Sequence, residues 1–180
     1  MGMIETPEQR WGRRTKPYHL TGEVNQEAYL HRLLPGEREA VQLLLQYVGI
    51  ASMSLMTASS VLAVGSSTDL KSPYGDIDLL VCPDDARARH QFAERIYRLL
   101  KSNNVFTVSG QSPLGSAPIS SPRYAPVKLF LFAAGAVDEQ SEPRLFDMTF
   151  LGEGGGTFDD TVAFHRHHNL AFAILNVGTQ

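Results

Sequence analysis

The chain has 180 residues, of which 43% are hydrophobic, and a formal net charge of −3 at pH 7. This length and composition are typical of one globular domain that buries a substantial core. The slight acidic excess argues against a protein that coats nucleic acid, but it does not exclude a local track of basic residues. A single cysteine, Cys82, excludes a disulfide framework. Since no apolar stretch reaches membrane-spanning length and no secretory leader is evident, we expect a cytoplasmic protein without a membrane partner.

Residues 1–34 are polar and irregular, and we expect them to form an N-terminal extension or arm. The basic residues around Trp11 and Tyr18 are Arg10, Arg13, Arg14 and Lys16. Such a segment either lies on the domain or contacts nucleic acid, with arginines against phosphates and rings stacked on bases. The folded domain is expected to span residues 35–180.

Helical periodicity begins at Pro35, which suits the first turn of a helix, and Gly49 can end that helix. The apolar residues of one helical face are Val41, Leu44, Leu45 and Val48. Residues 61–64 then read as a buried strand, and residues 76–82 as a second one.

Two aspartates, Asp76 and Asp78, stand two residues apart at the start of the second strand. Side chains alternate along a strand, so both carboxylates point to the same face. The residues predicted to face the core are Ile77, Leu79 and Val81. Like charges this close are unfavourable unless a cation lies between them. We therefore expect Asp76 and Asp78 to bind two Mg²⁺ ions, with Mn²⁺ as an alternative.

A glycine-serine turn, Gly65-Ser66, ends the first strand and precedes the two aspartates. Glycine lets the backbone approach phosphate oxygens, and the Ser66 hydroxyl can donate to them, with Ser67 as a weaker candidate. Lys71 in the loop that follows, and Arg123 or Lys128 further on, are candidates to neutralise a triphosphate. Together with the carboxylates, these residues predict a site for a metal-bound nucleoside triphosphate.

After this site, the chain is predicted to form a second helix from Pro83 to about Leu100 and a short strand over 105–108. A loop rich in serine, proline and glycine covers 109–124, and a strand follows at 126–132. Along that strand we expect Phe130 and Phe132 to be core residues, with base stacking as the alternative. A short charged loop over 138–143 then predicts that the next strand is an antiparallel neighbour.

The C-terminal segment is predicted to be one helix, capped by Asp159 and Asp160 and carrying apolar residues as far as Leu175. Its histidines, His165, His167 and His168, suit a solvated or phosphate-contacting helix face better than a zinc site, because no cysteine or clear acidic ligand accompanies them. The element order as a whole predicts an α+β fold, with a mixed sheet flanked by helices.

The pattern from residue 61 to 150 resembles the polymerase β-like nucleotidyltransferase superfamily. The resemblance rests on Gly65-Ser66 after one strand, on Asp76-Ile77-Asp78 in the next, and on an aspartate in a later strand, Asp147. It implies a palm-like nucleotidyltransferase domain in residues 35–180, with Asp147 as the third metal-binding and catalytic carboxylate. Glu153 is a nearby rival for that role. Asp69 departs from the pattern, because a negative charge is unhelpful in a phosphate-binding loop.

The resemblance implies a reaction type: an NMP moves from an NTP, such as ATP, to a hydroxyl, and pyrophosphate leaves. The acceptor is a small molecule, a protein side chain or a nucleic-acid 3′ end. Acidic composition favours the first two slightly, and a polymerase-like nucleic-acid acceptor is the close second. A catalytically idle fold that binds a nucleotide or a partner protein is the alternative from another class, and a metal-dependent nuclease is a weaker third.

Overall fold

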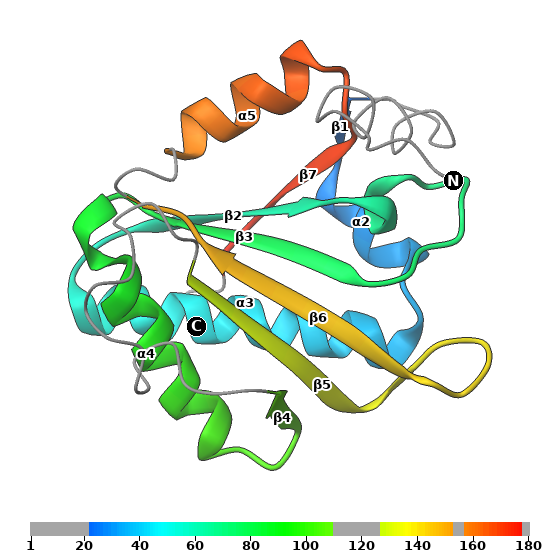
Figure 1. Ribbon diagram of the computed structural model, residues 1–180, viewed down its shortest axis with the longest axis horizontal. Helices are drawn as coiled ribbons and strands as arrows, with labels where there is room; N and C mark the ends of the chain where they lie inside the picture. Colours follow the sequence, from blue (N-terminus) through cyan, green and yellow to red (C-terminus); the bar gives the residue numbers. More distant parts are fainter. Residues whose placement is uncertain (1–21, 110–126, 153–156, 178–180) are drawn as a thin grey trace, which may run out of the picture.

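A seven-stranded mixed sheet organises the residues that the computed structural model describes, which are 22–109, 127–152 and 157–177 (Figure 1). The strands, in their order across the sheet, are β1 (Glu23–Val24), β7 (Phe172–Leu175), β2 (Ser59–Val64), β3 (Ile77–Pro83), β6 (Pro143–Phe150), β5 (Val127–Val137) and β4 (Phe106–Ser109). Neighbours pair in parallel at β1–β7 and β3–β6, and antiparallel elsewhere. The fold is therefore α+β with a mixed sheet, as predicted.

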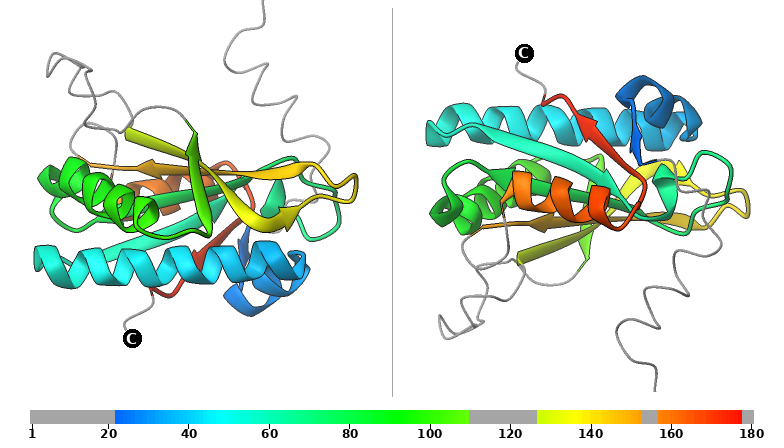
Figure 2. Two further views of the ribbon diagram at one scale, coloured as in Figure 1. Left: turned by 90° about the horizontal axis from the view of Figure 1, so that it is seen from below. Right: turned by 90° about the horizontal axis from the view of Figure 1, so that it is seen from above.

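Helices cover both faces of this sheet. The helices of the described residues are α2 (Gln26–Arg32), α3 (Pro35–Leu55), α4 (Arg89–Lys101) and α5 (Phe158–His167), with single 3₁₀ turns at η1 (Ser66–Thr68) and η2 (Ala86–Ala88). Helices α3 and α4 share one large hydrophobic cluster with the sheet, whereas α5 packs on a smaller cluster around Leu62 and Phe172. Strand β2 lies between α3 and α5 in both views of Figure 2. None of the described helices is long and apolar enough to cross a membrane.

Strand β3 divides its side chains between the two faces as the alternation predicts. Ile77, Leu79 and Val81 are buried in the cluster that contains α3 and α4. Asp78 lies on the opposite face, next to its cross-strand partner Val64 on β2. One strand thus supplies both core residues and a carboxylate, which fixes that carboxylate on a rigid element.

The first long helix continues past the predicted end at Gly49. α3 runs to Leu55, with Gly49 and Ala51 buried, and it ends where Met56 adopts a left-handed conformation at φ 54°. The prediction of an end at Gly49 was wrong because the apolar face extends a further turn. Burial against neighbours outweighs the intrinsic cost of glycine inside a helix.

The second helix begins later than predicted, because Pro83 is still the last residue of β3. A 3₁₀ turn follows, in which the Asp85 carboxylate accepts a hydrogen bond from the Arg87 N–H at 3.0 Å, and α4 starts at Arg89. Its end at Lys101 agrees with the predicted end near Leu100.

The predicted C-terminal helix is two elements. α5 ends at His167, the chain turns through Asn169 at φ 52°, and Phe172–Leu175 forms β7. Thr157 caps α5 through its hydroxyl, which accepts the Asp160 N–H at 3.2 Å, so the predicted cap at the aspartates was wrong by a few residues. Residues 172–175 are a strand because the edge of β2 offers them a ladder of backbone partners.

The segment expected to form an arm contributes β1 and α2 to this fold. β1 pairs with β7, and the Asn25 carboxamide caps α2 by accepting the Ala28 N–H at 2.7 Å. Tyr29 on α2 is completely buried. Residues 1–21, including the predicted basic-aromatic stretch, lie outside the described residues.

Strands β5 and β6 form the antiparallel pair that the short connecting loop predicts. The Asp138 carboxylate closes the turn by accepting backbone N–H groups from Gln140 at 2.8 Å and from Glu142 at 2.9 Å. β5 is longer than predicted, because it continues to Val137 through an irregularity after Phe132. This hairpin delivers β6 to the side of β3.

Candidate active site

Parallel pairing of β3 with β6 places two of the predicted carboxylates next to each other. Asp78 and Asp147 are register partners on neighbouring strands, and so they lie on the same face of the sheet. Asp76 immediately precedes β3, two residues before Asp78. The Asp147 side chain is only 14% exposed, and Asp78 is half-buried. The structure therefore brings together the three aspartates that the sequence singled out.

The pKa of the Asp78 carboxyl reflects the closeness of the three aspartates. Burial, together with the neighbouring charges of Asp76 and Asp147, raises the pKa of the Asp78 carboxyl to about 7. Lys128 acts in the opposite direction and lowers that pKa. A carboxylate that is both desolvated and next to two others gains most from a nearby cation.

The donor chemistry of this cluster fits a hard divalent cation such as Mg²⁺, because all three side chains offer carboxylate oxygens. Asp147 already has partners, however: its Oδ2 accepts from the Lys128 ammonium at 3.3 Å, and its Oδ1 accepts from the Thr149 hydroxyl at 3.4 Å. Over the ranges the structure describes, no three carboxylate, histidine or cysteine side chains form a ready-made metal site. A cation at Asp147 would therefore compete with Lys128.

The glycine-serine turn lies directly against the carboxylates. Gly65 follows β2 at φ 81°, a conformation that favours glycine, and it precedes η1. A Cβ atom on Gly65 would lie 2.5 Å from Oδ2 of Asp78. This close approach puts the exposed turn, with Ser66, beside the acidic cluster.

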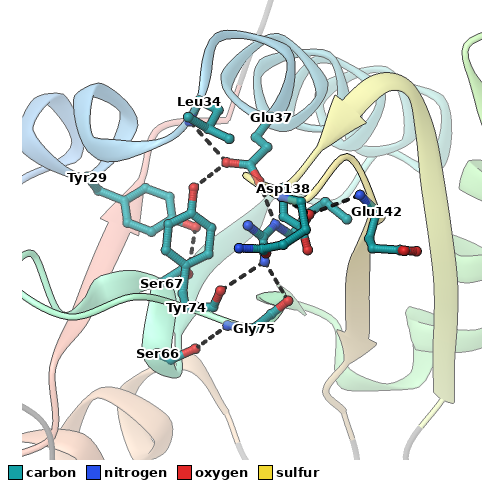
Figure 3. Close-up of polar contacts among 11 residues, drawn as sticks. Tyr29, Leu34, Glu37, Ser66, Ser67, Tyr74, Gly75, Asp138 and Glu142 are labelled. Carbon is teal, nitrogen blue, oxygen red and sulfur yellow. Dashed lines mark hydrogen bonds and ion pairs between the residues drawn. The ribbon is translucent and has the colours of Figure 1, made fainter.

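The two serines of the turn have different surroundings. The Ser66 hydroxyl is half-buried and accepts a hydrogen bond from the Gly75 N–H at 3.4 Å. Ser67 is fully buried, and its hydroxyl lies 3.1 Å from that of Tyr29 on α2 (Figure 3). Ser66 is therefore the hydroxyl positioned near the site, while Ser67 joins the turn to the domain interior.

The predicted cations occupy different places. Lys128 on β5 lies beside Asp147, as described above, whereas Lys71 is an exposed residue of the loop between η1 and β3. Arg123, and the rival acid Glu153, lie outside the described residues. Asp69, the departure in the loop, is buried, and its carboxylate accepts the Lys71 N–H at 3.2 Å. The carboxylate of Asp69 is thus buried in the protein interior.

Phe130 and Phe132 lie on the carboxylate face rather than in the core. Phe130 is the register partner of Asp147 and is 39% exposed, and Phe132 is half-buried on the same face. The expectation that both are core residues was wrong, because the alternation along β5 buries Val127, Leu129 and Leu131 instead. Phe130 thus presents an aromatic surface next to Asp147.

A set of residues that the sequence analysis missed fixes the loop between Ser66 and Asp76. Arg144 and Glu37 form a buried ion pair, and the ring of Tyr74 lies under the guanidinium of Arg144 at 4.5 Å. A signal for Arg144 was present, since it shares the strand face of the buried residues Phe146 and Met148. A charged residue at a core position of a strand indicates a buried partner. Periodicity alone gives no comparable signal for Glu37.

The histidines near the C-terminus have helix-internal contacts. Nδ1–H of His165 donates to the Thr161 carbonyl at 2.8 Å, and Nδ1–H of His168 donates to the Phe164 carbonyl at 2.9 Å. His165 is buried and packs edge-on against Phe172 of β7. His165 thus attaches α5 to the sheet, whereas the contacts of the exposed His168 stay within the helix.

No protein-family model matches the chain, and no curated protein matches its sequence. Among solved structures, it is similar to the Thermotoga maritima CCA-adding enzyme complexed with tRNA, at 17% identity and a TM-score of 0.39. Two further CCA-adding enzyme structures, an apo form and a complex with CTP, match at 18% identity with TM-scores of 0.38 and 0.37. The matches cover 69% of this chain and 22–23% of the solved chains. The chain thus spans less than a quarter of the length of each of these solved chains.

Proposed function

We propose that this protein is a metal-dependent nucleotidyltransferase with a polymerase β-like palm, which moves an NMP from an NTP to a hydroxyl. The observation that carries the proposal is the register of Asp78 with Asp147 on neighbouring parallel strands, with Asp76 two residues away. Two carboxylates on one rigid sheet face, with a third just before the strand, are costly without a cation, so the arrangement favours a function that binds one.

Each residue has a chemical task in this reaction. Asp76, Asp78 and Asp147 would hold two Mg²⁺ ions, or Mn²⁺ in their place, and these ions supply charge neutralisation and a lower acceptor pKa. The acceptor oxygen forms a bond to the α-phosphorus, the bond from that phosphorus to the bridging oxygen breaks, and pyrophosphate leaves. Asp147 accepts the proton of the acceptor hydroxyl.

We place the two substrates on different sides of the carboxylates, and the strand order supports this placement. Gly65 and Ser66 follow β2, which lies on one side of β3, so we place the triphosphate there. Lys128, which the sequence suggested as a triphosphate-neutralising residue, is with Phe130 on β5, on the far side of β6. We therefore place the acceptor, and not the triphosphate, over these two residues. Lys71 is exposed in the loop on the triphosphate side, where its charge can screen the leaving pyrophosphate.

Three chemical classes of acceptor suit this reaction. A small molecule, a protein side chain and a nucleic-acid 3′ end all present a hydroxyl. The acidic composition of the chain favours the first two. The exposed ring of Phe130 beside Asp147 also suits a nucleobase, because aromatic side chains stack on bases.

One observation favours a second candidate, a fold that binds a nucleotide or partner without catalysis. The ion pair of Lys128 with Asp147 occupies the carboxylate that the reaction needs, and the two atoms are 3.3 Å apart. In that case Lys128 would serve as a permanent substitute for the second cation. The protein would then bind Mg-NTP through Asp76 and Asp78 but release no pyrophosphate.

Pyrophosphate release tests the proposal directly. Each of the four NTPs is incubated with the protein and Mg²⁺ or Mn²⁺, with and without an oligonucleotide primer. The double variant Asp76→Ala/Asp78→Ala is compared with Asp84→Ala, which removes an exposed acid close by in sequence. Release by the wild type and by Asp84→Ala, but not by the double variant, supports the proposal. Mg-NTP binding without release under every condition would favour the non-catalytic fold.

A further inference from the structure

The loop between the glycine-serine turn and the first metal-binding aspartate is held from two sides by arginines. Arg32 on α2 donates to the backbone carbonyls of Ser67 at 3.2 Å, of Ser72 at 2.6 Å, and of Asp69. Arg144 on β6 donates to the carbonyls of Tyr74 at 2.8 Å and of Gly75 at 2.7 Å. Five carbonyls of one short loop are therefore bound by two side chains from distant segments.

Glu37, at the start of α3, anchors the second arginine. Its Oε2 accepts from Arg144 Nε–H at 2.5 Å, and its Oε1 accepts from the Leu34 N–H at 3.0 Å and from the Tyr74 hydroxyl (Figure 3). Glu37 is completely buried, and Arg144 is 3% exposed. A buried ion pair needs this full set of hydrogen bonds, since desolvation otherwise outweighs the attraction.

Tyr74 connects the two arginines. Both guanidinium groups, of Arg32 and Arg144, lie 4.5 Å from the centre of its ring, which is within the range of cation–π attraction. Burial and the neighbouring Glu37 raise the pKa of the Tyr74 hydroxyl, so it remains a hydrogen-bond donor. The loop is thus held through the Tyr74 side chain, whose ring contacts both arginines, and through its backbone carbonyls, which the arginines bind.

The position of this network relative to the carboxylates is its most informative property. Arg144 stands three residues before Asp147 on β6, and one of the two loop carbonyls that it binds belongs to Gly75, directly before Asp76. The N–H of Gly75 in turn donates to the Ser66 hydroxyl. Arg144 therefore links the strand of Asp147 to the segment that leads into Asp76, and Gly75 links that segment to the turn at Ser66.

We propose that Arg144, with Glu37 and Tyr74, is a positioning residue that pre-organises the 66–75 loop for binding of the Mg-NTP complex. This inference rests on the proposed nucleotidyl transfer. In this arrangement the strand that carries Asp147 also sets the position of Asp76, so the two metal-binding segments cannot shift independently. Pre-organisation of this kind reduces the ordering cost of binding, which is otherwise subtracted from affinity.

The variant Arg144→Lys tests the role with the least risk to folding. A lysine keeps the positive charge opposite Glu37, but it lacks the planar fork that also reaches the two loop carbonyls. We expect amide hydrogens of residues 66–76 to exchange about tenfold faster in the metal-free protein, because the loop opens locally. We expect the KM for the NTP to rise on the order of tenfold, with a smaller change in kcat.

Two further variants complete the comparison. Tyr74→Phe removes the bond to Glu37 but keeps the ring between the arginines, so we expect smaller changes of the same kind. Arg98→Lys is the matched control, because Arg98 forms an exposed ion pair with Glu94 on α4. It should leave both the exchange of residues 66–76 and the KM at wild-type values.

The two readouts separate failure of this inference from failure of the proposed function. Unchanged loop exchange in Arg144→Lys would overturn the positioning role, as would faster exchange with an unchanged KM. If the wild type releases no pyrophosphate at all, the proposed function falls, and calorimetric titration with Mg-ATP replaces the KM. Weaker Mg-ATP binding by Arg144→Lys than by Arg98→Lys would then still support the positioning role, and equal binding would refute it.

Discussion

Lys128 on β5 forms an ion pair with Asp147 on β6, with 3.3 Å between its Nζ and Oδ2 of the carboxylate. The pair joins a residue that we place on the acceptor side to the carboxylate that we expect to accept a proton. Lys128 thus neutralises part of the charge of the acidic cluster in the metal-free protein, in line with its lowering effect on the pKa of Asp78. A divalent cation bound at Asp147, as we propose, would compete with this lysine for the same oxygen.

Replacing Lys128 by methionine should therefore tighten metal binding. Removal of one unit charge about 4 Å from a ligand oxygen is worth about 1 kcal/mol in water, or about fivefold in affinity. Titration with Mn²⁺, followed by electron paramagnetic resonance, measures this change. The matched control is Lys71→Met, since Lys71 is exposed in the loop. Equal or weaker Mn²⁺ binding by Lys128→Met would show that the lysine does not compete with the cation.

Substitution of Gly65 by alanine should abolish transfer and destabilise the fold. The added methyl would meet Oδ2 of Asp78 at 2.5 Å, in a backbone conformation at φ 81° that side chains rarely adopt. We expect a loss of about 1–3 kcal/mol in the free energy of unfolding. Thermal and denaturant unfolding measure it. Gly75→Ala, at the other end of the loop and with open space around its Cβ position, should retain the wild-type stability.

Asp78→Asn should stabilise the metal-free protein while removing activity. The substitution relieves the repulsion of Asp78 by Asp76 and Asp147 and the cost of burying its charge. A gain on the order of 1 kcal/mol in the free energy of unfolding is expected at neutral pH, as for other functional residues held at a cost in stability. Asp84→Asn, at an exposed position, supplies the control for the change of side chain. A less stable Asp78→Asn protein would mean that the acidic cluster is not under strain.

The pH dependence of stability should contain a contribution from His165. Burial lowers the pKa of this imidazole from its ordinary value, so the folded state binds fewer protons than the unfolded state in weakly acidic solution. Stability is therefore lost as the pH falls through the unfolded pKa of about 6.5. Melting temperatures between about pH 7.5 and 5 should fall less steeply for His165→Gln than for the wild type. His167→Gln, at an exposed position, should match the wild-type slope, and a common slope for all three would exclude this role.

Local periodicity accounts for the parts of the site that the sequence predicts well. Alternation along β3 places Asp78 on the face opposite to Ile77 and Leu79, and this follows from strand geometry alone. The turn at Gly65 is equally local, because its backbone conformation at φ 81° favours a residue without a side chain. These predictions needed no knowledge of the neighbouring strands.

Other assignments depended on partners far away in the chain. The segment Phe172–Leu175 has apolar residues that suit a helix as well as a strand, and its pairing with β2 and β1 makes it a strand. The alternation along β5 does not by itself decide whether the strand face that carries Phe130 packs against the core. The packing of α3 and α4 on the other face decides that Phe130 is exposed.

The sequence by itself determined which residue types meet on one strand face and where the backbone turns beside them. Only the tertiary structure decided that Asp147 pairs with Asp78, and that Glu37 meets Arg144 across 107 positions of the chain. The physical reason lies in the range of the forces involved. Backbone geometry fixes side-chain direction within a few residues, whereas strand register and buried ion pairs depend on the free energy of the whole core.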